Sequence, residues 1–200
     1  MKAVILNGSP RKKGSTATAL RAIHDELATE AEVEWFDAYD LKLKPCMGCM
    51  KCRPDGECVL PADDAQRVRA AVSSSDILVV GTPAYWGNMT APLKMLFDRN
   101  VTLFESFDGG WPKPKQKGKR AAIVVSSGSP MPWSMLPTQG GGAIRSVRTI
   151  LRSGGYSIKG TMRLAAVKPE EVNGPRQTAQ AAAIARKLLA LAIIDPTHSA

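Results

Sequence analysis

The sequence predicts an α/β protein with a parallel β-sheet that is covered by helices on both faces. Two observations indicate this class. Short runs of aliphatic residues without polar alternation are typical of strands that are buried on both faces. These runs alternate along the chain with segments whose apolar residues recur at helical spacing. Five such pairs fit into 200 residues, so we expect a single domain over residues 1–200 with a full core.

The predicted strands are short apolar runs that are bounded by turn-forming or charged residues. The clearest is "DILVVG" (76–81), in which only the first and last residues are not aliphatic. We find no internal repeat, so each run is treated as a separate strand. The five strands are expected at residues 2–6, 33–37, 76–81, 121–125 and within 156–167.

The predicted helices carry apolar residues three or four positions apart. The first is expected from Ser15 to about Glu30, with Leu20, Ile23 and Leu27 on its buried face. Proline, acidic residues and threonine mark the starts of the later helices. The second is expected to open at Pro61 with Asp63 and Asp64, the third is capped by Thr90, the fourth contains Ile144, Val147 and Leu151, and the fifth starts at Pro175.

The net charge of +9 does not by itself predict nucleic-acid binding, because the positive residues are scattered and no zinc-finger or RNP signature is present. Small anionic ligands are expected instead. The run 113–120 (KPKQKGKR) is interpreted as a solvated segment, or as one that attracts an acidic partner or a phosphorylated nicotinamide. His24 and His198 are expected to be structural or exposed, and no Ser/His/Asp arrangement supports a hydrolase.

No segment of the sequence predicts membrane insertion. The run "AVIL" near the start is far too short for the apolar region of a signal peptide. The late run "LLALAII" is interrupted upstream by Arg186 and Lys187, so it cannot extend into a transmembrane helix. We therefore expect a cytoplasmic protein that does not bind membranes.

Unusual residues gather in the loops that follow the predicted strands. The loops 7–16, 82–90 and 126–141 follow the first, third and fourth strands, and the loop after the second strand holds all four cysteines. In open parallel sheets, ligands bind beyond the carboxyl ends of the strands, where the strand order reverses. The sequence therefore predicts that the chemistry lies at one edge of the sheet.

The first loop, "NGSPRKKGST" (7–16), leads from a strand into a helix, and the helix N-terminus favours an anion. It is neither a Walker A loop nor a G-x-G-x-x-G turn, so a single terminal phosphate fits it best. The alternative is an ordinary turn with a serine N-cap. The side chains that can contact the phosphate are those of Ser9, Arg11, Ser15 and Thr16.

The second loop lies within "TPAYWGNMTAPLKMLFDR" (82–99). Pro83 and Gly87 permit a tight turn, so Tyr85 and Trp86 are expected in an exposed loop. A flat aromatic ligand is one reason for bulky aromatics at such a position. The alternative is that Trp86 packs on the next helix or on a partner subunit. A phosphate cradle and an aromatic platform on adjacent strands together describe a site for flavin mononucleotide (FMN).

These two segments resemble the FMN-binding signatures of the flavodoxin-like NAD(P)H-dependent FMN reductase superfamily, and the likeness spans residues 1–126. The resemblance implies a doubly wound sheet with strand order 2-1-3-4-5, and NAD(P)H as co-substrate. It also implies that Ser9, Arg11, Ser15 and Thr16 hold the phosphate, while the 83–89 loop contacts the isoalloxazine ring. The remaining candidate cofactor residues are Pro83, Ala84, Tyr85, Trp86, Gly87, Asn88, Ser127 and Gly128.

The cysteine loop (45–60) carries Cys46, Cys49, Cys52 and Cys58 in a C-x2-C-x2-C-x5-C pattern. Zinc ribbons usually carry two separated CxxC knuckles, whereas this run resembles the start of a bacterial ferredoxin motif. With the FMN signatures, it is similar to the iron–sulfur flavoprotein branch of the superfamily, which implies a 4Fe–4S cluster beside the flavin. Thiols, a disulfide or zinc are the alternatives. We expect the cysteines at the FMN edge, because their loop leaves the carboxyl end of the second strand.

The sequence thus predicts an FMN-dependent oxidoreductase that passes electrons from NAD(P)H or a ferredoxin-like donor to a small-molecule acceptor. A cluster-free NAD(P)H:quinone, azo or FMN reductase is the first alternative, and a non-catalytic electron carrier or redox sensor is the second. Tryptophans at 86, 111 and 133, expected in exposed loops, suggest apolar surface that a monomer would not leave uncovered, and the resemblance to the superfamily implies a homodimer or homotetramer. The segment 126–142 is interpreted as a flexible substrate wall over the flavin or as a subunit contact.

Overall fold

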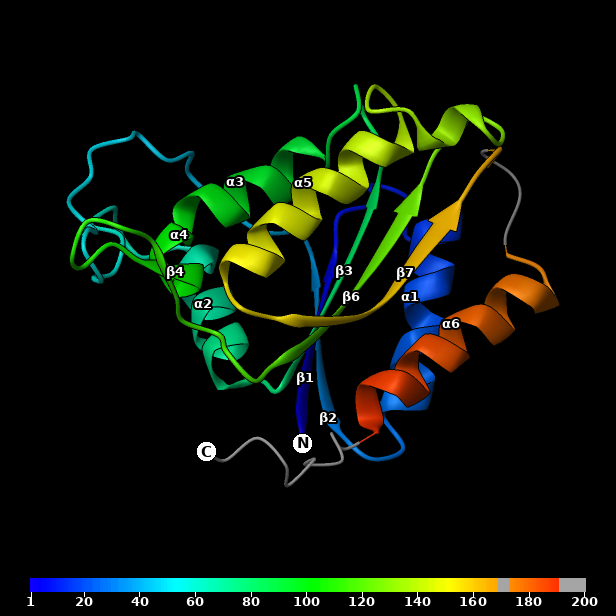
Figure 1. The fold of residues 1–200 in the computed structure, drawn as a ribbon, viewed down its shortest axis with the longest axis horizontal. Coiled ribbons are helices and arrows are strands. Elements are labelled where there is room, and N and C mark those ends of the chain that lie inside the picture. The colour runs from blue at the N-terminus through cyan, green and yellow to red at the C-terminus, as the bar shows by residue number, and fades with distance from the viewer. Residues whose placement is uncertain (169–172, 191–200) are drawn as a thin grey trace, which may run out of the picture.

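The computed structural model describes residues 1–168 and 173–190. Its main sheet has five parallel strands in the order β2-β1-β3-β6-β7, which is the predicted flavodoxin-like order. The strands run side by side in Figure 1, with their carboxyl ends toward the top of the view. They are β1 Lys2–Asn7, β2 Glu32–Asp37, β3 Ile77–Pro83, β6 Arg120–Ser126 and β7 Ser157–Leu164.

Helices cover both faces of this sheet, as the sequence predicts. In Figure 1, α1 and α6 lie on one side of the sheet, and α2, α3 and α5 lie on the other. Each face has its own cluster of buried apolar side chains, so the sheet separates two cores. The helices are α1 Ser15–Leu27, α2 Asp64–Ser74, α3 Ala91–Arg99, α5 Gly140–Ser153 and α6 Pro175–Leu189.

The central strand β3 shows why the apolar runs have no polar alternation. Every residue of β3 is buried. Leu78 and Val80 belong to the core under α2, α3 and α5, whereas Ile77 and Val79 belong to the core under α1 and α6. Because successive side chains of a strand point to opposite faces, a strand between two cores must be apolar at every position.

The first helix is shorter than predicted. α1 ends at Leu27 rather than near Glu30, and a turn follows in which the Glu30 N–H bonds to the Leu27 carbonyl at 3.1 Å. The Glu32 N–H then bonds to the Met1 carbonyl at 3.0 Å. The helix thus ends at Leu27 because β2 must pair with β1. The apolar periodicity of the sequence does not mark this end.

Thr90 precedes α3 as expected, but its hydroxyl does not cap the helix. It donates instead to the Gly8 carbonyl at 2.8 Å, and the Gly8 N–H bonds to the Gly81 carbonyl at 2.7 Å. A Cβ atom on Gly8 would lie 2.8 Å from Cδ2 of Leu93, so any other residue at this position would force the buried Leu93 side chain to shift. These contacts tie the loops after β1 and β3 together at the edge of the sheet.

Several short elements were not predicted. Gly140–Gly142, expected in the substrate-wall loop 126–142, form the first turn of α5, and a single 3-10 turn, η1 (Trp133–Met135), lies within that loop. Close packing accounts for the glycines, because a Cβ atom on Gly142 would lie 1.9 Å from the Pro137 carbonyl oxygen.

The run 113–120 begins in a two-stranded antiparallel hairpin rather than in open coil. The additional elements are α4 Val101–Phe104, β4 Glu105–Ser106 and β5 Lys113–Pro114.

No helix in the described ranges is long and apolar enough to cross a membrane. His24 is half-buried on α1, where its Nδ1 lies 3.0 Å from the exposed carboxylate of Asp25. It therefore has a structural setting, as expected. His198 lies outside the described residues.

Candidate functional site

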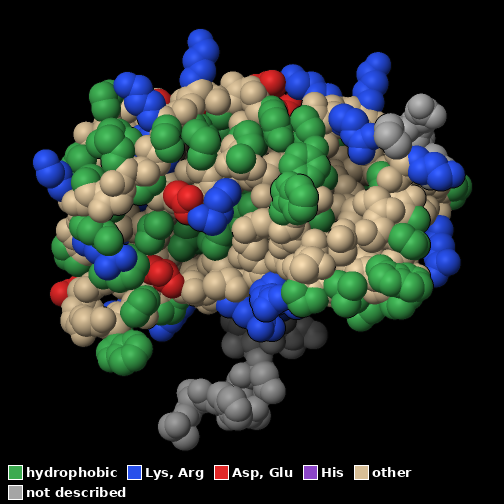
Figure 2. Space-filling model, turned by 90° about the horizontal axis from the view of Figure 1, so that it is seen from above, with side chains coloured by type: hydrophobic (Ala, Val, Ile, Leu, Met, Phe, Trp, Pro, Cys, Tyr) green, Lys and Arg blue, Asp and Glu red, His purple; other side chains and the backbone are tan. Residues whose placement is uncertain are grey.

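The loops that follow β1, β3 and β6 meet at the carboxyl edge of the sheet. Figure 2 looks onto this edge and shows hydrophobic side chains exposed among scattered lysines and arginines. The edge is a surface of loops and helix starts, because parallel strands all end there. The exposed apolar residues in its loops include Trp86, Met131, Trp133, Met135 and Leu136.

The loop after β1 is held in shape by hydrogen bonds from its own side chains. Asn7 donates to Asp37 on β2 at 2.6 Å and accepts from the Ser9 N–H at 3.1 Å. The Ser9 hydroxyl accepts from the Arg11 N–H at 3.2 Å and donates to the Arg11 carbonyl at 3.3 Å. Ser9 is buried, so its hydroxyl shapes the loop, whereas the Arg11 side chain is exposed.

The start of α1 favours an anion. Gly14 is the N-cap residue and contributes no side-chain cap, and no acidic residue lies in the first turn. The positive end of the helix dipole therefore meets no negative side chain of its own helix. Lys12 makes an ion pair with Asp40 across the loop, Nζ to Oδ2 2.5 Å, and this hydrogen bond raises the pKa of Lys12. Lys12 therefore stays protonated.

Thr16 connects two strands at this edge. Its hydroxyl lies 2.7 Å from the hydroxyl of Ser126 at the end of β6, and both side chains are buried. The structure thus gives Thr16 a bracing contact between the β1 and β6 loops. Its backbone N–H lies in the first turn of α1, which is the part of the residue that a helix-end anion would use.

The loop after β3 forms a tight two-residue turn. Tyr85 and Asn88 exchange backbone hydrogen bonds of 2.9 Å in both directions, and the two central residues have positive φ angles, 52° at Trp86 and 70° at Gly87. This is a type I′ turn. A Cβ atom on Gly87 would lie 2.4 Å from the Pro137 carbonyl oxygen, so glycine is required there. The turn extends the Trp86 side chain fully into solvent, at 101% relative exposure.

A cavity of about 160 Å³ gathers residues from three of the predicted loops. It lies between the loop after β1 and the ends of β3 and β6. The arrangement explains why loops that are distant in sequence carry related residues. Of the predicted cofactor residues, the cavity brings together Arg11, Pro83, Ala84, Tyr85, Ser127 and Gly128.

The other predicted cofactor residues lie elsewhere. Ser15 lines a neighbouring cavity of about 280 Å³ between the starts of α1 and α6. Gly87 and Asn88 line a shallow groove on the α5 side, Trp86 is fully exposed, and the Ser9 and Thr16 side chains bond within the protein. The structure therefore does not gather all of the predicted residues around one cavity.

Sequence reasoning missed Pro10, Ser126 and Val167, which also line the smaller cavity. Val167 follows β7, and it lines the neighbouring cavity as well. The rule that ligands bind beyond the carboxyl ends of the strands applies to the loop after β7 too. That loop was overlooked because it contains no glycine-rich or aromatic motif.

The cysteine loop lies beside α4 and the β4–β5 hairpin (Figure 1), and none of its residues lines the cavity. The Gly56 carbonyl accepts from the Thr102 hydroxyl at 2.7 Å, and the Pro54 carbonyl accepts from the Phe107 N–H at 2.9 Å. The Arg53 guanidinium lies 3.9 Å from the centre of the Phe107 ring. These contacts hold residues 53–56 near the C-terminal end of α3. The sequence instead placed the cysteines at the FMN edge, which lies at the other end of this helix.

All four cysteines are free thiols, two exposed and two half-buried. In the part of the chain that the structure describes, no three His, Cys, Asp or Glu side chains are close enough together to hold a metal ion. The Gly48 N–H contacts the Cys46 sulfur at 3.4 Å, a contact of the kind that surrounds cluster thiolates. The donor set thus fits an iron–sulfur cluster in its chemistry, while the sulfur atoms are not gathered around one centre.

The smaller cavity fits one end of a flavin nucleotide. An ideal Cβ atom on Gly128 would meet no other atom closer than the Val167 carbonyl oxygen at 4.0 Å, so this glycine borders open space. The lining offers the Arg11 guanidinium, two serine residues and an aromatic ring, and the anion-favouring start of α1 is adjacent. A charged fork and a helix N-terminus are the donors that a phosphate ester uses.

Two curated relatives are similar to part of the chain. One is an iron–sulfur flavoprotein of Methanocaldococcus jannaschii, 36% identical over 104 residues, which are 52% of this chain and 53% of that protein. The other is an iron–sulfur flavoprotein of Archaeoglobus fulgidus, 36% identical over 126 residues, which are 62% of this chain and 54% of that protein. The chain spans about half the length of these curated relatives.

The fold resembles that of an FMN-dependent NADH-azoreductase from Bacillus anthracis, solved in complex with FMN. The TM-score is 0.72, the sequence identity is 12%, and the match covers 95% of this chain and 100% of that one. At this identity the likeness shows the flavodoxin-like fold. Residues 1–134 match the model of a family described as NADPH-dependent FMN reductase, and they include the loops after β1, β2 and β3. The chain therefore belongs to the NADPH-dependent FMN reductase family.

Proposed function

We propose that the protein is an oxidoreductase that binds FMN at the carboxyl edge of the sheet and passes electrons from a nicotinamide nucleotide to a small-molecule acceptor. The observation that carries this proposal is the cavity where Arg11, Tyr85 and Gly128 meet, in a chain of the NADPH-dependent FMN reductase family. FMN, when bound, supplies both two-electron and one-electron chemistry. The protein's part is to bind and orient it.

Different residues are proposed to bind the phosphate and the ring of FMN. Arg11 and the start of α1 are proposed to hold the phosphate, because they supply a charged fork and a helix N-terminus. Pro83 to Tyr85 form the wall of the cavity toward β3, where backbone groups can contact the flavin ring. Ser127 and Gly128 form the wall toward β6, and the absence of a side chain at 128 keeps that wall open.

Titration of the apo-protein with FMN, followed by anaerobic mixing with NADPH or NADH, tests this function. Saturable one-to-one FMN binding, bleaching of the flavin and turnover on a quinone or azo compound are the expected results. Bleaching only by reduced ferredoxin, with none by either nucleotide, would instead identify an electron carrier. A protein that does not bind FMN at all would contradict the proposal.

We also propose that Cys46, Cys49, Cys52 and Cys58 hold a 4Fe–4S cluster, which supplies single-electron transfer when bound. Support comes from the names of the curated relatives, from the four cysteines on one loop, and from their free thiols. Because these thiols are not gathered in the structure, cluster binding requires the segment between residues 46 and 58 to close around the metal. Four unpaired cysteines also support the proposed cytoplasmic location.

Iron and sulfide analysis of protein prepared without oxygen tests the cluster. Replacement of any one cysteine by serine is expected to remove most of the iron and to leave FMN in place, because FMN is proposed to bind at a different loop. Met47→Ser is the matched control, since Met47 is an exposed residue between the first two cysteines and offers no thiolate. Wild-type protein with flavin but neither iron nor sulfide would favour the cluster-free reductase.

A homodimer or homotetramer is proposed as well. Trp86 is fully exposed in the loop after β3, and Trp133 and Met135 are 59% and 57% exposed in the loop after β6. Apolar surface of this kind on one face is typical of a subunit contact. Light scattering of the FMN-loaded protein at micromolar concentration tests the proposal, and a monomeric mass would rule it out.

A further inference from the structure

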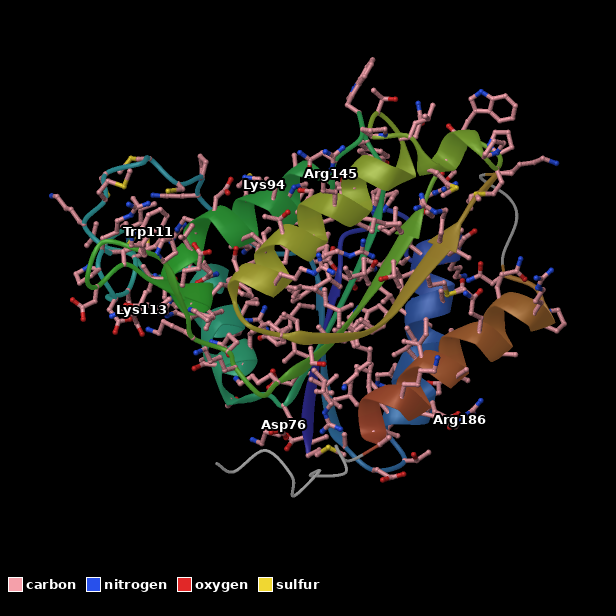
Figure 3. All side chains as sticks on the ribbon, in the orientation of Figure 1. Asp76, Lys94, Trp111, Lys113, Arg145 and Arg186 are labelled. Atoms are coloured by element: carbon pink, nitrogen blue, oxygen red, sulfur yellow. The ribbon has the colours of Figure 1, made fainter. Side chains whose placement is uncertain are left out.

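A groove of about 470 Å³ lies between α5 and the edge strand β7, on the face of the sheet opposite α6. We call it the arginine groove, because four of its lining residues are arginines. Figure 3 labels one of them, Arg145, on α5. None of the lining residues is acidic. The polar residues that line it are Arg145, Arg148, Arg152, Arg163, Thr149 and Thr161.

The secondary structure explains why these side chains converge. Arg145, Arg148 and Arg152 are spaced three and four residues apart on α5, so they lie along one face of the helix. The opposite face of α5 is buried in the core through Ala143, Ile144, Val147 and Leu151. Arg163 enters the groove from β7, so two independent elements bring positive charge to one place.

The groove is strongly positive, because four arginines and no acidic residue line it. No carboxylate among the described residues forms an ion pair with any of the four arginines, whereas Arg186 on α6 pairs with Glu26 and Arg67 on α2 pairs with Asp64. Arg148 donates instead to the Thr161 hydroxyl at 3.2 Å. Burial, and then repulsion from Arg148, lowers the pKa of Arg163. An anion in the groove would relieve this repulsion.

Two hydrogen bonds connect the arginine groove to the proposed FMN cavity. Arg163 donates through Nη1 to the Ser134 carbonyl, and the Ser134 hydroxyl lies 2.8 Å from the hydroxyl of Ser127. Ser127 in turn lines the cavity that we propose for FMN. The loop that carries Ser127 and Ser134 therefore connects the two sites.

We propose that the arginine groove binds the phosphorylated adenylate end of a nicotinamide nucleotide that carries a 2′-phosphate, so that it favours NADPH over NADH. The inference rests on the proposed function, since it assigns one end of that function's electron donor. Arginine forks match the geometry of phosphate oxygens in pairs. The volume of the groove lies in the range of small-ligand sites, which suits a nucleotide fragment.

Binding of adenosine 2′,5′-bisphosphate to the FMN-loaded protein, measured by calorimetry against 5′-AMP, tests the inference. Saturable binding of the bisphosphate, at least about tenfold tighter than AMP, is expected. Arg148→Gln and, separately, Arg145→Gln should each weaken the bisphosphate about tenfold and leave AMP unchanged. The Arg145 side chain forms no hydrogen bond or ion pair with the other described residues, so the Arg145→Gln variant should fold even if the loss of the Arg148–Thr161 contact disturbs β7.

Arg186→Gln is the matched control, because it removes the same charge from α6, which Figure 3 shows on the far side of the sheet from Arg145. It should change neither affinity. Equal affinity for the bisphosphate and AMP, no saturable binding, or unchanged bisphosphate binding in both groove variants would overturn the inference. If neither NADPH nor NADH bleaches the flavin, the proposed electron donor fails, while the bisphosphate titration still decides what the groove binds.

Discussion

Nη1 of Arg99 lies 2.6 Å from Oδ2 of Asp63, in an ion pair whose arginine side chain is completely buried. The same nitrogen also donates to the Lys44 carbonyl at 2.7 Å. Lys44 and Asp63 lie just before and just after the segment that carries the four cysteines, so one arginine of α3 fastens both ends of that loop. Asp63 is also the N-cap of α2 and accepts from the Ala65 N–H at 2.9 Å.

Asp63→Asn should destabilise the protein by about 3 kcal/mol at neutral pH, because it removes the carboxylate that pairs with the buried Arg99 charge. Asparagine keeps the oxygen that caps α2, so the loss reports the ion pair. Denaturant unfolding measures the effect. The control is Asp64→Asn, in which the lost ion pair with Arg67 is more exposed, and its cost should be clearly smaller. Equal costs for the two variants would contradict this assignment.

The Arg99–Asp63 ion pair also predicts how the stability of the fold falls at acid pH. Burial alone would raise the pKa of Asp63, but the hydrogen bond from Arg99 and those from two backbone N–H groups lower it below the ordinary value. A carboxyl with a depressed folded-state pKa stabilises the fold above its unfolded pKa, and this contribution is lost as the pH falls through the folded value. Acid unfolding of the wild type should therefore be steeper, below about pH 4, than that of Asp63→Asn.

Arg11→Ala should weaken FMN binding by about 1.5–3 kcal/mol, the scale of a hydrogen bond to a charged group. Arg11 is exposed and lines the smaller cavity, so the change should leave the fold intact. Fluorescence titration of the apo-protein measures the affinity. Lys13→Ala removes an equal charge from the same loop and should have a smaller effect, since Lys13 does not line the cavity. Unchanged affinity in Arg11→Ala would reject Arg11 as a phosphate ligand.

Gly128→Val tests the cavity by filling it. The new side chain would point into space that holds no atom closer than 4.0 Å, so the apo-protein should keep its melting temperature. FMN affinity should fall at least about tenfold, because the ligand would have to displace the side chain. Normal FMN affinity with normal stability would show that the flavin binds elsewhere on the carboxyl edge.

Tyr156→Phe should stabilise the protein by about 1 kcal/mol. The Tyr156 side chain is buried beside Phe104, and within the described residues its hydroxyl has no hydrogen-bond partner. An unpaired buried hydroxyl costs desolvation free energy, and phenylalanine removes that cost while it keeps the ring. Thermal unfolding should show a rise of roughly 2–4 °C. A fall in stability would indicate a bound water that the hydroxyl contacts.

Tyr156 also predicts that the stability of the fold falls at alkaline pH. Burial raises the pKa of Tyr156 well above its ordinary value of 10.0. An acid whose folded-state pKa is raised contributes its full stability below the unfolded pKa, and this contribution is lost as the pH rises above it. Wild-type stability should therefore fall above pH 10, and that part of the decline should be absent in Tyr156→Phe.

Local sequence patterns were sufficient to predict the five strands of the main sheet and the loops that form the site. The run at 76–81 is apolar because β3 lies between two cores, so its class followed from composition alone. The strand order came from the likeness of two short segments to a known family. The β4–β5 hairpin gave no periodic signal, because two-residue strands are too short to show one.

The sequence predicts which loops form the site, but not which of their side chains enter the cavity. That the loops after β1, β3 and β6 come together follows from chain order, since parallel strands end at one edge. Which side chains enter the cavity does not follow, because a turn sets side-chain direction through its backbone angles. Trp86 sits at a positive φ and points to solvent, while its neighbour Tyr85 lines the cavity.

Contacts between distant residues decided the rest. The hydroxyl of Thr16 bonds to that of Ser126, 110 positions away, and Arg99 draws the cysteine loop toward α3 and α4. No local pattern contains this information, because each hydrogen bond forms only after packing has brought both partners together. Four arginines from α5 and β7 form one groove for the same reason: their charges are visible in the sequence, but their convergence requires the folded chain.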